Sequence, residues 1–78
     1  MKNIEQEISE LSALIEANPA DADALYRRGS LRWRLGQRAG SLTALNAAAK
    51  LNPDGPAPAA LAHLNGIMNF FNPDLYNP

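Results

Sequence analysis

Apolar side chains recur at helical spacing near the start of the chain. Ile4, Ile8, Leu11 and Ile15 lie three or four residues apart, which is the pattern of an amphipathic helix. Asn3 precedes this stripe as a candidate N-cap, and Pro19 follows it as a helix breaker. The pattern therefore predicts a first helix over about residues 3–17.

Three further segments have the same character and are separated by turn-forming residues. Asp21 is a candidate N-cap for a second helix over about 21–35, and Gly36 can close it. A third helix is predicted over about 39–51, because Pro53 disfavours helical backbone just before it. A fourth is predicted over about 58–71, with Pro58 at its first position and an apolar stripe of Leu61, Leu64, Met68 and Phe71. Residues 72–78 are predicted to be an irregular C-terminal tail. No segment alternates with period two, so no strand is expected.

An internal repeat links the first and third predicted helices. The dipeptides Asn18-Pro19 and Asn52-Pro53 lie 34 residues apart. The residues before each dipeptide also correspond, since apolar residues at 8, 11, 13, 14 and 17 match apolar residues at 42, 45, 47, 48 and 51. A helical repeat of this length is the sequence signature of stacked helix hairpins.

The composition of the chain argues against several classes of function. The chain has 78 residues, enough for one domain. It contains no cysteine and a single histidine, His63, so we expect no disulfide, no metal site and no cofactor. The formal net charge of −1 gives no field that would attract nucleic acid, and no apolar stretch is long enough to span a membrane. These features favour a cytoplasmic protein.

Residues 22–53 resemble a tetratricopeptide repeat. The family pattern W-x2-L-G-x2-Y, A-x3-F and P corresponds here to Leu25, Arg28, Gly29 and Arg32, then Ser41 and Leu45, then Pro53. The resemblance implies an all-α fold, a four-helix antiparallel tetratricopeptide-like α-α superhelix fragment with right-handed stacking of helix hairpins. It also implies that residues 1–71 form a single helical domain, with one full repeat between two half-repeats. In the family, the residues at Gly29 and Ala48 are the small contacts between the two helices of a repeat.

Two arginines depart from the family pattern. Arg28 and Arg32 stand where the family buries a leucine and a tyrosine. An arginine can lay its methylenes on apolar surface while its charged head reaches water, so we expect looser packing on this side of the repeat. Gly66 falls where the small contact residue of the fourth helix would lie if the preceding linker adds three residues.

The second predicted helix has two separate faces. Ala24, Leu31 and Leu35 are expected to pack on the first helix, against Ile8, Leu11 and Ile15. By resemblance, the other face lines the concave groove in which the family holds peptides or partner helices. Tyr26 and Trp33 are aromatic residues of the kind that anchor interfaces, and the charged side chains of Arg27 and Arg34 can bind an extended or acidic segment. The predicted partner-binding residues are Asp23, Tyr26, Arg27, Ser30, Trp33, Arg34 and Gln37.

A structural role for the same aromatics stays open. Tyr26 and Trp33 can equally be core residues beneath the fourth helix, and Phe70, Phe71 or Tyr76 can fill the groove from within the chain.

The charges are unevenly distributed along the chain, since five of the seven basic residues lie between Arg27 and Arg38 whereas the first helix is acidic. This asymmetry predicts ion pairs between neighbouring helices, within one chain or between chains.

No residue constellation indicates catalysis. His63 has no carboxylate within a helical turn, no serine has a base beside it, and there is no glycine-rich phosphate loop. We therefore predict a non-catalytic module that binds a protein or peptide on the concave face of the repeat, without nucleic acid or membrane. The alternative is a structural protein that forms a homodimer through its exposed repeat ends, because roughly three repeats are normally needed for stability and this chain has about two.

Overall fold

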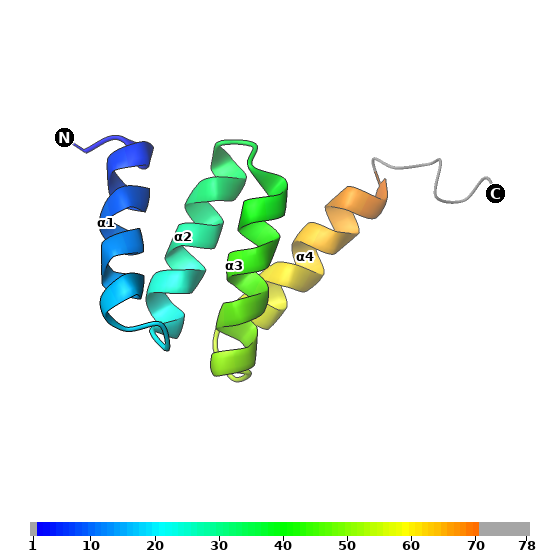
Figure 1. Cartoon of the computed structure of the whole chain (residues 1–78). Coiled ribbons are helices and arrows are strands. Elements are labelled where there is room, and N and C mark those ends of the chain that lie inside the picture. Colours follow the sequence, from blue (N-terminus) through cyan, green and yellow to red (C-terminus); the bar gives the residue numbers. More distant parts are fainter. Residues whose placement is uncertain (1, 71–78) are drawn as a thin grey trace.

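The described part of the chain is entirely α-helical. The structure, a computed structural model, describes residues 2–70, of which 67–70 are described as backbone only. Within this range it contains four helices, namely α1 (Ile4–Ala17), α2 (Ala22–Arg34), α3 (Arg38–Leu51) and α4 (Ala57–Phe70). They form a row in which each helix packs on the next along the chain, with α1 and α4 at opposite ends (Figure 1). The predicted tail at 72–78 lies outside the described residues.

Side-chain caps fix the starts of the first two helices where the sequence predicts them. Asn3 Oδ1 accepts a hydrogen bond from the Gln6 backbone N–H at 2.8 Å, and Gln6 Oε1 accepts one from the Asn3 backbone N–H at 3.0 Å. This reciprocal capping box satisfies two backbone donors that the first turn of a helix leaves unpaired. Asp21 Oδ1 caps α2 by accepting from the Ala24 backbone N–H at 3.0 Å.

The predicted helix bounds need small corrections at α2, α3 and α4. The α2 helix ends at Arg34, and Gly36 turns the chain in the left-handed region, with φ of 80°. The α3 helix begins at Arg38, one residue before the prediction, because the Gln37 carbonyl already accepts from the Ser41 backbone N–H. The α4 helix begins at Ala57, which makes Pro58 its second residue; the Ala60 N–H bonds to the Pro56 carbonyl, so no helical bond needs the N–H that Pro58 lacks.

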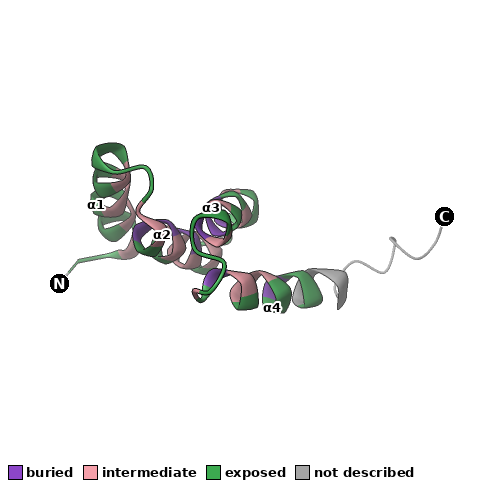
Figure 2. Cartoon of the chain, turned by 90° about the horizontal axis from the view of Figure 1, so that it is seen from below, coloured by how far each residue is buried: buried purple, intermediate pink, exposed green. Residues whose placement is uncertain are grey.

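The hydrophobic core lies where α2, α3 and the first half of α4 meet. Its buried members are Leu25, Leu45, Ala48, Ala57 and Leu64. Figure 2 shows the buried positions gathered on these helices. The core is small, so the molecule depends on close approach of its helix backbones.

Gly29 brings α2 and α3 into that close approach. A Cβ atom at this position would lie 2.9 Å from Leu45 Cγ and 3.1 Å from the Ser41 carbonyl oxygen, both shorter than ordinary van der Waals contact. Leu45 is fully buried as a result. The predicted close contact at Gly29 is thus present, whereas Gly66 has no atom within 4 Å of such a Cβ and makes no close helix contact among the described residues.

The α1 helix packs much less tightly than the sequence predicts. None of its residues is buried, and Ile15 is the α1 side chain that packs against the core residues. Of the three α2 residues predicted to pack on α1, Ala24 is buried, Leu31 is half-buried and Leu35 stays 37% exposed. Leu35 is more open than a packed position because it is the C-cap of α2, where the chain turns toward α3.

Arg28 and Arg32 lie half-buried on the side of α2 away from the aromatics. The Arg28 Nη1 group donates to Ser12 Oγ of α1 at 3.1 Å. Arg32 lies across α3, where a Cβ on Gly40 would come within 3.2 Å of its Cδ. The Nε–H groups of both arginines are buried and have no hydrogen-bond partner among the described residues. Burial, followed by the charge of Arg32, lowers the pKa of Arg28. The two arginines therefore act as polar spacers between α2 and its two neighbours.

Candidate functional site

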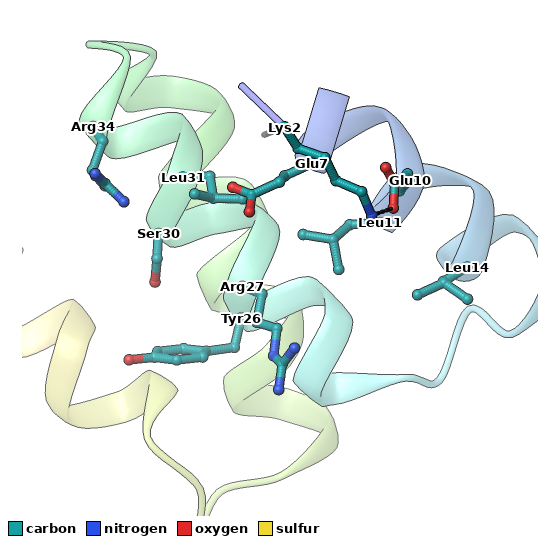
Figure 3. A pocket seen from close by; sticks show the side chains of 10 residues that line it. All are labelled: Lys2, Glu7, Glu10, Leu11, Leu14, Tyr26, Arg27, Ser30, Leu31 and Arg34. Carbon is teal, nitrogen blue, oxygen red and sulfur yellow. Dashed lines mark hydrogen bonds and ion pairs between the residues drawn. The ribbon is translucent and has the colours of Figure 1, made fainter. Parts of the chain in front are cut away.

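A groove opens between α1 and α2. It is shallow and wide, with a volume of about 610 Å³. Its lining residues come from the chain start, α1 and α2, and are Lys2, Glu7, Glu10, Leu11, Leu14, Tyr26, Arg27, Ser30, Leu31 and Arg34 (Figure 3). We call this feature the α1–α2 groove.

The floor of the α1–α2 groove is apolar. Leu11 and Leu31 are half-buried and face each other across it, and Leu14 lies farther along α1 (Figure 3). Leu14 keeps 54% of its surface exposed, so most of this apolar side chain is free to contact a partner. Three leucines at the floor of one groove provide the apolar surface that a partner side chain can cover.

The two walls of the groove carry opposite charge. Glu7 and Glu10 line the α1 wall, whereas Arg27 and Arg34 line the α2 wall. Lys2 reaches over to Glu10, with Nζ 2.6 Å from Oε1, and this hydrogen bond raises the pKa of Lys2. The walls can therefore select a ligand by the order of its charges.

The predicted ion pairs between neighbouring helices do not form within the described part of the chain. The two pairs found there join Lys2 to Glu10, and Arg27 to Asp23 at 3.0 Å within α2. Both are solvent-exposed, and such pairs contribute about 0–1 kcal/mol each. The polar side-chain link between α1 and α2 is the Arg28–Ser12 hydrogen bond. Glu7 and Arg34 consequently keep their charge available at the groove.

The seven predicted site residues do not form one surface. Tyr26, Arg27, Ser30 and Arg34 line the α1–α2 groove. Asp23 instead borders a small hollow of about 60 Å³ at the start of α4, which Tyr26 also reaches. Gln37 is exposed at the N-cap position of α3.

Trp33 does not line the α1–α2 groove. It is half-buried and packs against the core together with Tyr26 and Leu61. The Arg38 guanidinium lies over the indole, 5.9 Å from the ring centroid, which is within the range of a cation–π contact. This packing supports the core role that the sequence left open for both aromatics. The other open alternative, a groove filled by Phe70, Phe71 or Tyr76, falls on side chains outside the described residues.

The contribution of α1 to the groove was missed by the sequence analysis. The α1 residues that line it are Glu7, Glu10, Leu11 and Leu14. The 34-residue spacing held the missing signal, because it places these four residues at the positions of Ser41, Ala44, Leu45 and Ala48, all of which are buried. Where a residue is buried on α3 and its repeat equivalent is open on α1, the α1 surface has no described helix packed over it.

Other kinds of site find no support among the described residues. No three His, Asp or Glu side chains lie close enough there to hold a metal ion. No helix in that part of the chain has the length and apolar character needed to cross a membrane. Comparisons with known protein families, curated proteins and solved structures found no match to this chain.

Proposed function

We propose that this chain is a non-catalytic protein-interaction module that binds a partner helix or peptide in the α1–α2 groove. The observation that carries the proposal is the apolar floor, where Leu14 stays 54% exposed beside Leu11 and Leu31. Four of the predicted partner-binding residues line the same groove, so the proposal keeps Tyr26, Arg27, Ser30 and Arg34 and adds the α1 wall. The opposite charges of the walls supply orientation as well as affinity.

We further propose that α2 and α3 form one tetratricopeptide-like repeat, with α1 and α4 as half-repeats of a superhelix fragment. Three features support this arrangement. Gly29 packs on Leu45, Ser41 and Ala48 are buried small residues, and the helices follow one another in a row. On this view, the α1–α2 groove lies at the open end of the repeat stack.

Two matched leucines provide the test of the binding proposal. Leu14 lines the groove, whereas Leu51, which is 46% exposed near the end of α3, does not. Tagged wild-type, Leu14→Asp and Leu51→Asp proteins are used to capture partners from the native cell, with recovery measured by quantitative mass spectrometry and folding checked by circular dichroism. The proposal predicts that Leu14→Asp loses at least about tenfold of the specific partner while Leu51→Asp retains it. Equal recovery by all three proteins would contradict it.

Self-association is the second candidate function. It is favoured by the two ends of the row, because α1 has no buried residue and Gly66 of α4 has no neighbour within contact distance among the described residues. A second copy that covered either end would bury this surface. Sedimentation equilibrium at increasing protein concentration tests the idea, since a homodimer gives a mass that rises to twice that of the chain. A constant monomer mass into the high micromolar range would rule the homodimer out.

A further inference from the structure

The internal repeat relates a covered face of α3 to an uncovered face of α1. We call Ser41, Ala44, Leu45 and Ala48 the α3 face, and all four are buried. Moved back by 34 residues, they become Glu7, Glu10, Leu11 and Leu14, which we call the α1 face. All four residues of the α1 face line the α1–α2 groove. The same repeat position is therefore core in one helix and groove wall in the other.

The α3 face shows what covers such a surface. The α2 helix lies on it, with Gly29 against Leu45 and the Ser41 backbone, and the start of α4 completes the cover through Ala57 beside Ala48. The same 34-residue shift relates the start of α4 to α2, and α2 supplies Tyr26, Leu31 and their neighbours to the groove. A helix that packed on α1 in the way that α2 packs on α3 would therefore lie in the groove.

From this correspondence we propose that the α1–α2 groove takes an amphipathic α-helix of a partner protein, placed on α1 as α2 is placed on α3. The proposal rests on the proposed function and specifies its ligand. The residue that meets Leu11 should be glycine, because Leu11 holds the place of Leu45, and a Cβ at Gly29 would come within 2.9 Å of Leu45 Cγ. Apolar residues one turn to either side would cover Leu14 and Leu31.

The charges of the groove define the rest of the partner helix. Glu7 and Glu10 replace Ser41 and Ala44, so a helix seated on the α1 face brings carboxylates into its interface. Glu10 is already paired with Lys2, but burying Glu7 unpaired is costly, and a basic side chain on the partner removes that cost. The opposite edge of the helix lies along Arg27, which is paired with Asp23, and along Arg34, which calls for an acidic residue. The partner is thus a helix with a small residue, a basic edge and an acidic edge.

A second copy of this chain fits the groove poorly. The α4 helix lies at the other end of the row, but residues 57–70 contain no Lys, Arg, Asp or Glu. It would offer no counter-charge to Glu7, whereas Glu10 is already paired with Lys2. The α2 helix has the right charges and the small residue, yet it is already packed on α3 in its own chain. Charge complementarity therefore favours a different protein as the partner.

The sequence of α2 provides a direct probe of the proposal. A fluorescent synthetic peptide of residues 21–37, acetylated and amidated, carries the helix that fits the α3 face, including Gly29 and its arginines. Binding to the full chain is followed by fluorescence anisotropy at low salt. A second peptide with Gly29→Leu has the same charge and a side chain too large for the close approach. Glu7→Lys is compared with Glu5→Lys, since both lie in the first turn of α1 and Glu5 does not line the groove.

The expected result is saturable binding of the α2 peptide to the wild-type chain and to Glu5→Lys. Binding should weaken about tenfold or more with Glu7→Lys and with the Gly29→Leu peptide. Equal binding of the two peptides, equal affinity of the two glutamate variants, or no binding at all would overturn the helix proposal. These outcomes would leave the proposed function intact if Leu14→Asp still loses its captured partner. Self-association of the chain that Leu14→Asp abolishes would also overturn it, because a second copy would then fill the groove.

Discussion

At the residue scale, two glycines make opposite predictions for the same substitution. Alanine is more favourable than glycine inside a helix by about 1 kcal/mol. At Gly66 none of the described residues lies within contact distance of a new Cβ, so Gly66→Ala should stabilise the protein by about 0.5–1 kcal/mol. At Gly29 the new Cβ would meet Leu45 and the Ser41 backbone, so Gly29→Ala should destabilise it by about 1–3 kcal/mol. Urea denaturation of both variants measures the difference, and a stabilised Gly29→Ala variant would contradict the α2–α3 packing.

Ser41 gives a second prediction at this scale. Its side chain is fully buried, and its Oγ has no hydrogen-bond partner among the described residues. Removing an unpaired buried hydroxyl ends its desolvation penalty, and alanine also has the higher helix propensity. Ser41→Ala should therefore raise the free energy of unfolding by about 1 kcal/mol in the same denaturation experiment. A loss of stability would mean that the hydroxyl is hydrogen-bonded in solution.

At the element scale, the junction between α1 and α2 is held partly by polar groups. Arg28 is half-buried there, and its pKa is lowered by desolvation and by the charge of Arg32. Arg28→Leu removes both costs and adds apolar contact, whereas it loses the hydrogen bond to Ser12. We expect a gain of about 1 kcal/mol in thermal or urea unfolding. Arg27→Leu, on the exposed side of α2, is the control and should change stability by less than about 0.5 kcal/mol.

The helices were predictable from local sequence, whereas which helix packs against each of their faces was not. Asn3, Asp21 and Gly36 act through their immediate neighbours, so the helix ends agree with the predictions to within a few residues. The close contact at Gly29 was expected from the resemblance to the tetratricopeptide pattern. The fate of Leu35 and Trp33 depends on which helix lies against each face of α2, and a helical wheel does not contain that information. The groove escaped prediction for the same reason, since Leu11 and Leu14 read as ordinary core positions.

At the scale of the whole molecule, stability is unevenly distributed along the row of helices. The core residues lie on α2, α3 and α4, and α1 has none that is buried. Local opening needs less free energy where few apolar contacts are broken, so α1 should open before the centre of the molecule. Hydrogen exchange should show amide protection in α1 at least about tenfold below that in α2 and α3. Equal protection across the three helices would show that α1 is an integral part of the cooperative unit.

The α1 face is the centre of this account, and intermolecular nuclear Overhauser effects test it most directly. The chain is labelled at its leucine methyl groups and mixed with the unlabelled peptide of residues 21–37. If the peptide lies on α1 as α2 lies on α3, the Leu11 methyls will show contacts to the α-protons of the peptide's Gly29, as Leu45 does to Gly29 within the chain. Peptide contacts confined to leucines outside the α1–α2 groove, such as Leu51, Leu61 or Leu64, or no contacts at all, would contradict the account.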